Sequence, residues 1–453
     1  MPTTQSKLSS EEEEDFNKSR KEAMKFMAMM GPCVFMIVTG KFNPKPNLKK
    51  SILSNTLLVH TLLTGGQLLN QSRPLLVLDI YNKNAQSAAA KLAQLGSLGG
   101  VMEFAFNPLI GRLSDKFGRK PFLMLSPIVC CLLRLSVYLN PTNLTVITIE
   151  RMFSVSVVTG FFTSMRAAIN DKLSGKDLAI SSGSIAVWAG MGVILGPFIE
   201  AFILRNFGAK YSFLTVAILN FFVTLRFATT LEETCPKEQR KEIDWVACNP
   251  FSFTQVLGIS NVTQTLMGVL ALQAFGEGRI TQDINQLFLG QHLGWSHDLI
   301  GYFQSIYGLG IVLGGKFIKQ SLTTLGSFGH TTMSHWTTAI GYMIRAFVQT
   351  PLGQYGGLLV MLPGGRKRDA VEAIVTDVSL ANSDMGKGQI AAALSNFKSL
   401  ATIFGPSLAG YMYSFGFRNG ISGAPFYQIA LFYVIADLLF RSLSKKEMGI
   451  DEE

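Results

Sequence analysis

Runs of about 20 mostly apolar residues recur along the chain from Ile52 to Leu443, and this repetition limits the fold more than any other feature. Each run is long enough to cross a hydrocarbon layer of ~30 Å as a helix, which satisfies its own backbone hydrogen bonds where no water is present. The composition agrees, because 48% of the residues are apolar and only 15% are charged. The sequence therefore predicts an all-α membrane protein.

Twelve transmembrane helices are predicted, and several are long enough to tilt in the bilayer. They cover residues 53–80, 91–111, 121–140, 143–170, 178–204, 210–230, 263–290, 298–319, 330–349, 352–376, 388–415 and 424–442.

The charged connector LEETCPKEQRKEIDW, residues 231–245, divides these helices into six and six. Weak internal echoes, such as MRAAIND at 165–171 and RDAVEAIVTD at 368–377, suggest two pseudo-symmetric six-helix bundles. We expect the following parts: a cytoplasmic N-terminal extension over 1–50, an N-terminal bundle over 51–230, a cytoplasmic linker over 231–257, a C-terminal bundle over 258–443 and a cytoplasmic tail over 444–453.

The formal charge of +10 fits a membrane orientation better than a nucleic-acid surface, because the basic residues stand in short connectors rather than on one soluble face. Most of these connectors fall on one side if the helices alternate, and the positive-inside rule makes that side cytoplasmic. An even number of helices then places both termini in the cytoplasm. Residues 22–40 are apolar but interrupted by Lys25, Gly31 and Pro32, so we predict an interfacial helix or buried flank there rather than a thirteenth span.

The stretch GRLSDKFGRK, residues 111–120, places five charges between two apolar runs. Its residues Gly111, Leu113, Asp115, Gly118, Arg119 and Lys120 match the loop between helices 2 and 3 of the major facilitator superfamily, a family of secondary transporters. The surrounding residues 102–126 resemble the tetracycline-type drug and proton antiporters of that family. Weaker matches follow in order: Arg151 and Asp171 in helix 4, Gly192, Gly196 and Pro197 in helix 5, residues 231–234 after helix 6 and residues 388–406 in helix 11.

Two departures from the family pattern stand out. Glu200 and Ala201 replace the usual glycine pair at the end of the helix 5 motif, and Thr64 stands where the tetracycline antiporters carry an aspartate in helix 1. The second departure argues against export of tetracycline or cationic drugs.

The resemblance implies a cytoplasmic latch. The carboxylate of Asp115 would meet the start of helix 11 near Gln389, where free amides and the helix dipole favour negative charge. Arg119 would bridge to Asp171 at the end of helix 4. Such contacts act as a switch when they exist in only one of two states. The predicted latch residues are Gly111, Asp115, Gly118, Arg119, Lys120, Arg151 and Asp171.

In this fold the substrate is bound between helices 1, 4, 7 and 10, and here each of these helices carries an arginine among other polar residues. Ionisable groups at membrane depth face cavities or partners because they are costly in lipid. We therefore expect an anionic or zwitterionic small-molecule substrate. The candidate binding residues are Gln67, Asn70, Arg73, Arg166, Arg279, Asp283, Arg368 and Glu372.

Helix 10 allows two interpretations. Either Pro363, Gly364 and Gly365 break it, so that a half-helix with free amides and three cations begins near Arg366, or the segment 363–375 is a solvent loop. The broken helix is favoured, because only about eleven apolar residues precede Pro363 and a span needs about 20.

Four carboxylates are candidates for proton coupling, since burial can raise the pKa of such a group: Glu103, Glu200, Glu277 and Asp283. The leading hypothesis is a secondary active transporter, ion- or proton-coupled, that works by alternating access. The alternative is a transport-inactive, transporter-like receptor or assembly subunit. We expect no enzyme activity, no cofactor and no metal site, since no nucleotide-binding loop or metal-ligand spacing is present, and we expect a monomer in the bilayer without a nucleic-acid partner.

Overall fold

The structure is a computed structural model that describes residues 67–172, 192–231, 233–240, 248–276, 278–364 and 367–450. These residues form helices and connecting turns, with no strand among them. In the first half they form η1 (Gln67–Leu69), α3 (Ser72–Ile80), α4 (Ala85–Phe117), α5 (Arg119–Leu139), α6 (Leu144–Lys172), a helix over 192–206 and α8 (Ala209–Thr230).

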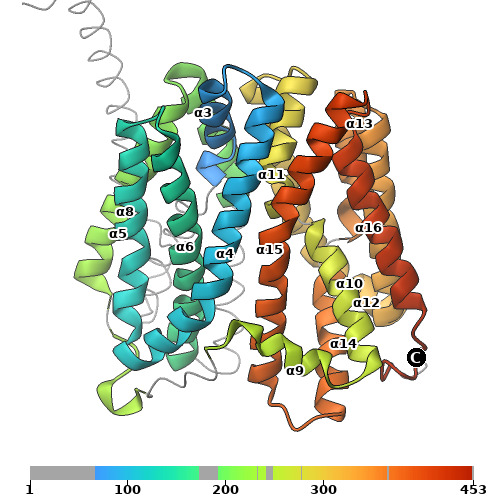
Figure 1. The fold of residues 1–453 in the computed structure, drawn as a ribbon. Helices are drawn as coiled ribbons and strands as arrows, with labels where there is room; N and C mark the ends of the chain where they lie inside the picture. The colour runs from blue at the N-terminus through green and yellow to red at the C-terminus, as the bar shows by residue number, and fades with distance from the viewer. Residues whose placement is uncertain are drawn as a thin grey trace, which may run out of the picture.

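The linker and the second half continue the helical pattern. Their elements are η2 (Lys237–Gln239), η3 (Pro250–Ser252), α9 (Phe253–Leu257), α10 (Asn261–Phe275), α11 (Gly278–Leu287), the π-helix η4 (Phe288–His292), α12 (His297–Phe347), α13 (Pro351–Met361), η5 (Leu362–Gly364), α14 (Lys367–Ala381), α15 (Lys387–Arg418) and α16 (Ala424–Arg441). Elements of the first half lie on the left of Figure 1 and those of the second half on the right, with α4 beside α15 where the two meet.

The two spans predicted at 298–319 and 330–349 both lie in α12. Gly326 has non-helical angles (φ 64°, ψ 178°) that reverse the chain, and glycine tolerates this region because it has no Cβ. The reversal brings His330 Nδ1 to 2.9 Å from Ser321 Oγ, nine residues earlier. The predicted break in helix 10 is also present, between α13 and α14. The predicted N-terminal extension and the segment 22–40 lie outside the described residues.

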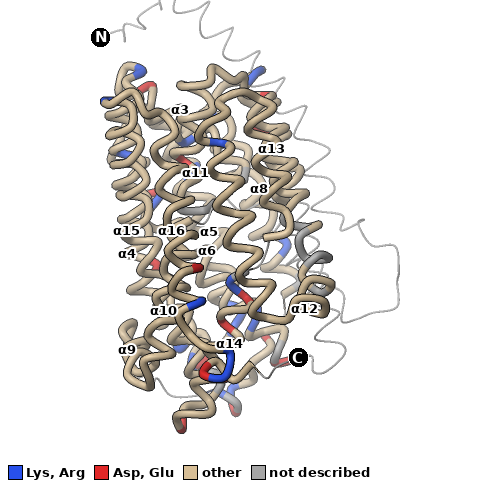
Figure 2. The backbone as a smooth tube through the Cα atoms, turned by 90° about the vertical axis from the view of Figure 1, so that its right-hand side faces the viewer, with Lys and Arg blue, Asp and Glu red and all other residues tan. Residues whose placement is uncertain are grey.

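The outer surface of the bundle is apolar, as lipid requires. On α5 the exposed side chains include Leu125, Ile128, Leu132 and Leu135, which recur every three or four residues and so line one face. The polar Arg134 on the same helix is buried instead, at 2% exposure. Four described segments are long and apolar enough to cross a membrane: Arg119–Leu139, Leu144–Ile169, Ala209–Thr229 and Ala424–Arg441. In Figure 2 long stretches of helix between the two ends of the molecule carry no charged residue.

The two ends of the molecule carry different connecting segments. The basic end carries the loop at 111–120, the linker residues 233–240 and the turn at 382–386. The opposite end carries the turns at 81–84, 140–143, 206–208, 293–296 and 419–423. We call it the closed end because the two halves are joined on that side.

Candidate functional site

Close packing joins α4 of the first half to α15 of the second half. A Cβ placed on Gly100 would lie 2.3 Å from the carbonyl oxygen of Thr402, and one on Gly96 would lie 2.7 Å from the Pro406 side chain. The two helices therefore approach more closely here than larger residues allow. Ser97 Oγ and Ser407 Oγ are 2.8 Å apart in the same contact.

The helix over 192–206 makes a second contact between the halves, with α12. Ser305 Oγ donates a 2.7 Å hydrogen bond to the carbonyl oxygen of Ile194. A Cβ on Gly301 would lie 3.0 Å from the carbonyl oxygen of Pro197, so a larger residue would require the neighbouring backbone to shift slightly. Nearer the end of the molecule, Arg205 and Asp298 form an ion pair at 3.0 Å. These contacts lie between the middle of the bundle and the closed end.

A small cavity of 30 Å³ lies between the halves on the inner side of these contacts. It is lined by Glu103 on α4, Arg151 on α6, Asp283 on α11 and apolar residues of α4 and α15. Arg151 Nη2 lies 3.7 Å from Asp283 Oδ2, which makes this an ion pair across the two halves. Glu103 is buried and accepts a 3.3 Å hydrogen bond from Thr159 Oγ1. The cavity therefore brings together two carboxylates and one guanidinium from both halves.

This position corrects the expected role of Arg151. The sequence placed it in the latch with Asp171, but the two are twenty residues apart on α6 and therefore about 30 Å apart along its axis. Arg151 belongs to the central cavity with Asp283, and only Asp171 reaches the basic end.

A buried charge cluster occupies the interior of the first half. Arg73 Nη2 of α3 lies 3.0 Å from Glu150 Oε2 of α6, and Arg134 Nε of α5 lies 3.9 Å from Glu150 Oε1. The Arg73 guanidinium also lies 6.0 Å from the centre of the Phe213 ring. Arg73 was expected to face the substrate, but its side chain is 5% exposed and engaged within one bundle. The apolar pattern of the first helix did not reveal that its arginine has a partner 77 residues later.

The remaining substrate candidates differ in what surrounds them. Asn70 is buried beside the start of α3, while Arg166 on α6 is exposed and forms no ion pair with the residues that the structure describes. The side chains of Gln67 and Arg279 lie outside the described part of the chain.

Helix 10 contributes an ion-pair network on α14. Arg368 Nε lies 3.2 Å from Glu372 Oε1, the pairing expected from their spacing of four, and Lys398 Nζ of α15 lies 2.7 Å from the same oxygen. These two described contacts join two cations to the carboxylate of Glu372. Arg366 lies outside the described residues, so the predicted cluster of three cations at the start of the half-helix stays a prediction.

At the basic end, the contact predicted between Arg119 and Asp171 is present. Arg119 Nε donates to Asp171 Oδ2 at 3.1 Å, and Arg119 Nη1 donates to Ser114 Oγ at 3.1 Å. Thr234 Oγ1 of the linker donates to the same Asp171 oxygen at 3.2 Å. The loop is therefore tied to the end of α6 and to the linker, all within the first half and its connector.

Among the described residues, the expected contact of Asp115 with the start of helix 11 is not made in this conformation, and for the other state it stays a prediction. Asp115 forms an ion pair with Arg119 on its own loop. The start of α15 is capped locally instead, because Gly386 N donates to Gln389 Oε1 at 3.1 Å. The backbone amide of the N-cap residue Gly386 is therefore satisfied by a side chain of the same helix.

Glu233 is a residue of this loop cluster that the sequence did not single out. Its carboxylate accepts hydrogen bonds from the backbone amides of Arg119 (2.8 Å) and Lys120 (3.2 Å), which are the first amides of α5. It also accepts from the amides of Thr234 and Cys235, each at 3.0 Å. A Cβ on Gly118, whose φ is +101°, would lie 2.3 Å from the carboxylate, so the motif glycine makes room for this cap.

The environment of Glu233 favours its ionised form. Partial burial opposes ionisation, but the amide hydrogen bonds outweigh it and lower the pKa of the Glu233 carboxyl from its ordinary value. The L-P-E-T-like sequence at 231–234 was the available signal, because it placed a glutamate directly after helix 6 in a position typical of the family.

Of the four proton-coupling candidates, Glu103 and Asp283 line the central cavity and Glu200 is fully buried on the helix over 192–206. Glu277 lies outside the described residues. Among the described residues, no group of three or more His, Cys, Asp or Glu side chains is arranged to hold a metal ion.

Two helical bundles packed around a polar centre, with a charged loop at one end, are the architecture of secondary transporters. The profile of the Major Facilitator Superfamily matches residues 62–363, which is about two thirds of the chain. The chain belongs to this superfamily and is therefore an integral, multi-pass membrane protein rather than an enzyme.

Within the superfamily the chain is similar to tetracycline resistance proteins. It is 25% identical over 366 residues to the class C protein of Escherichia coli, an alignment that covers 79% of this chain and 89% of that protein. It is 24% identical over 376 residues to the class H protein of Pasteurella multocida, covering 81% and 90%. The predicted resemblance of the chain to the tetracycline-type branch is thus confirmed.

Solved structures show the same fold at lower sequence identity. The human organic anion transporter MFSD10 (TETRAN) superposes with a TM-score of 0.60 at 16% identity, covering 87% of this chain and all of that one. A D-xylose-proton symporter superposes with a TM-score of 0.67 at 15% identity, covering 86% and 96%.

Proposed function

We propose that this protein is a secondary active transporter that moves a small solute across the membrane by alternating access of a central site to the two sides. The observation that carries the proposal is the ion pair between Arg151 and Asp283, which joins the two halves at 3.7 Å beside the central cavity. A charged contact between the halves at membrane depth is costly unless it is paired, and it can open when a solute or an ion replaces one partner.

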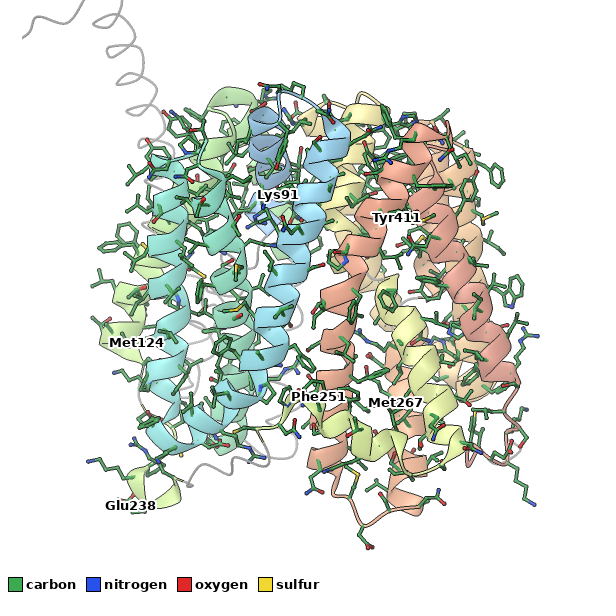
Figure 3. All side chains as sticks on the ribbon, viewed as in Figure 1. Lys91, Met124, Glu238, Phe251, Met267 and Tyr411 are labelled. Carbon is green, nitrogen blue, oxygen red and sulfur yellow. The ribbon has the colours of Figure 1, made fainter. Side chains whose placement is uncertain are left out.

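We assign the present conformation to the inward-facing state. The positive-inside rule makes the basic end cytoplasmic, and the closed end with its packed glycines then lies on the outer side. Both termini would then be cytoplasmic. On the basic side of the cavity, Phe251 contacts Phe104 of α4 with 5.3 Å between the ring centres. Figure 3 labels Phe251 between the two halves. In the outward-facing state the basic end would close, and the loop at 111–120 would act as its latch.

The proposed substrate is anionic or zwitterionic, because Arg166 is exposed on α6 without an ion-pair partner in the described part of the chain, and α14 with α15 holds two cations around Glu372. The pairing of Arg73 with Glu150 removes one of the four arginines from this argument. MFSD10 is named as an organic anion transporter, and the tetracycline resistance proteins are named for that drug. An organic anion and tetracycline are therefore the first probes to test on this protein. We propose a monomer as the transporting unit, with no nucleic-acid partner.

The test is uptake into proteoliposomes across a pH gradient, with carboxyfluorescein as the anionic probe and tetracycline as the drug probe. We expect uptake of the anion to exceed that of protein-free vesicles, to collapse when the gradient is dissipated and to fall in Arg166→Gln. The exposed Lys237→Gln at the linker is the matched control for loss of a positive charge. Uptake confined to lipophilic cations would contradict the proposed substrate class. If the protein binds solutes but transports none of them, the result would support the alternative stated in the sequence analysis, a transporter-like receptor.

A further inference from the structure

We infer that Glu200 is a proton-binding site of the transport cycle, and that a proton on its carboxylate loosens the closed end; the inference rests on the proposed function. Glu200 replaces one of the glycines that the family's helix 5 motif places after G-P-x-x. A carboxylate introduced at that position adds a titratable group where the two halves meet.

The Glu200 side chain is fully buried and binds the N-terminal end of α3. Its Oε1 accepts hydrogen bonds from the backbone amide of Gln71 (2.9 Å), the backbone amide of Ser72 (2.8 Å) and the hydroxyl of Ser72 (2.7 Å). These amides belong to the N-terminal end of α3, where the helix dipole favours a negative charge. The other oxygen, Oε2, finds no hydrogen-bond partner among the described residues. One oxygen is thus held by three donors, while the other is open to a proton.

The charges around Glu200 are committed to other partners. Arg73, two residues into α3, is paired with Glu150. Arg205 on the same helix as Glu200 is paired with Asp298 at the start of α12, and the neighbouring His297 presents its backbone carbonyl to Gln71. No ion pair to Glu200 exists within the described part of the chain. Its negative charge is therefore stabilised by hydrogen-bond donors at the start of α3, with no counter-charge among the described residues, and a buried carboxylate without a counter-charge binds a proton readily.

Protonation of Glu200 weakens its hydrogen bonds to residues 71 and 72 but does not remove them. A proton added at Oε2 forms an O–H bond and makes the carboxyl neutral. Hydrogen bonds from N–H groups to a neutral carbonyl oxygen are weaker than those to a carboxylate. Residues 71 and 72 are therefore held less tightly in place by Glu200.

Gln71 links Glu200 to the second half of the chain, because it contacts both. While its backbone amide is held by Glu200, its side-chain Nε2 donates to the backbone carbonyl of His297 at 3.3 Å. The helix that carries Glu200 also contacts α12 through Ser305. Loosening Gln71 therefore weakens a bridge between the halves at the closed end, which favours opening there.

A cavity of 70 Å³ lies beside Gln71, whose backbone amide donates to Glu200. It lies between α3 and the α11–η4 segment, and its lining includes Gln286, Gln291 and His297. The buried atoms Gln71 Oε1 and Gln286 Oε1 find no hydrogen-bond partner among the described residues. At roughly 15 Å³ for each water, the space suits about four water molecules that these groups can bind.

The test measures the distance across the closed end as a function of pH. Spin labels are placed on Thr142→Cys and Arg418→Cys, both exposed and on opposite halves, with the five native cysteines replaced by serine. Purified protein in lipid nanodiscs is equilibrated at each pH, frozen and measured by double electron–electron resonance, so no substrate is needed. Infrared spectra over the same pH range follow the C=O band of a protonated carboxyl group.

For the protein with Glu200, we expect a longer-distance population to grow as the pH falls, with the carboxyl band growing in parallel. Glu200→Gln imitates the neutral acid, so its longer-distance population is expected at every pH, without that band. Ser72→Ala removes one donor to the charged form and is expected to raise the midpoint by about one pH unit, which provides a second readout if Glu200→Gln is unstable. Glu238→Gln, at an exposed residue of the linker, is the control and is expected to keep the original midpoint.

An unchanged midpoint and band in Glu200→Gln would overturn the assignment, and so would a distance that ignores pH in the unsubstituted protein. Neither result decides the proposed function, because uptake in proteoliposomes is measured separately. If uptake is measured but the closed end does not respond to pH, only the inference about Glu200 is contradicted. If no solute is taken up, the proposed function itself is contradicted.

Discussion

Replacing Glu233 by alanine should destabilise the basic end measurably, because its carboxylate caps α5 and holds four backbone amides. Loss of a helix N-cap costs about 0.5–2 kcal/mol, and loss of a negative charge at a helix N-terminus costs about 0.3–1 kcal/mol. Together these predict a decrease of about 1–3 kcal/mol in the free energy of unfolding. Since 1.4 kcal/mol is tenfold in an equilibrium constant, the unfolded fraction should rise about 5-fold to 100-fold.

The assay is reversible unfolding in mixed micelles, with Glu238→Ala as the matched control because Glu238 is exposed on the adjacent η2. The pKa of the Glu233 carboxyl is lowered in the folded protein, so its stabilising effect is present above the unfolded-state pKa of about 4.3 and is lost as the pH falls through the folded-state value. The difference in stability between the protein with Glu233 and Glu233→Gln should therefore shrink below about pH 4. Equal losses for Glu233→Ala and Glu238→Ala at neutral pH would refute the capping argument.

Two further substitutions probe the packing and the buried charges. Glu150→Gln leaves two buried guanidinium groups without their counter-charge and should lower the free energy of unfolding by about 3–5 kcal/mol, against a negligible change for Glu238→Gln in the same titration. Gly100→Ala puts a Cβ 2.3 Å from the carbonyl oxygen of Thr402 and should lengthen the spin-label distance across the closed end, whereas Gly356→Ala, which meets nothing within 4 Å, should leave that distance unchanged.

The helices and the family were accessible from sequence because their signals are local. Apolar runs predicted the spans, and the chain reversal at Gly326 falls between the spans predicted at 298–319 and 330–349. The break before α14 falls where proline and glycine had indicated it. The loop motif also predicted the contact of Arg119 with Asp171, because both residues occupy positions typical of the family.

Pairings between distant helices were not accessible in this way. Glu150 looks like any other polar residue of α6 until the fold brings Arg73 and Arg134 to it. The sequence likewise assigned Asp115 to helix 11, since it could not show which conformation the chain adopts or that Gln389 caps that helix itself. Glu200 lies between these cases: the departure from the motif marked the position, but only the structure shows that it holds the start of α3.

The most direct test of alternating access is solute uptake with the closed end locked. Ser97 Oγ and Ser407 Oγ are 2.8 Å apart across the two halves, so cysteines at these positions can form a disulfide with little movement. In a background without the native cysteines, uptake of the probe that the proteoliposome screen identifies is measured before oxidation, after oxidation and after reduction. We predict that oxidation abolishes uptake and that reduction restores it, while each single-cysteine protein is unaffected. Uptake that continues at full rate in completely cross-linked protein would contradict the account.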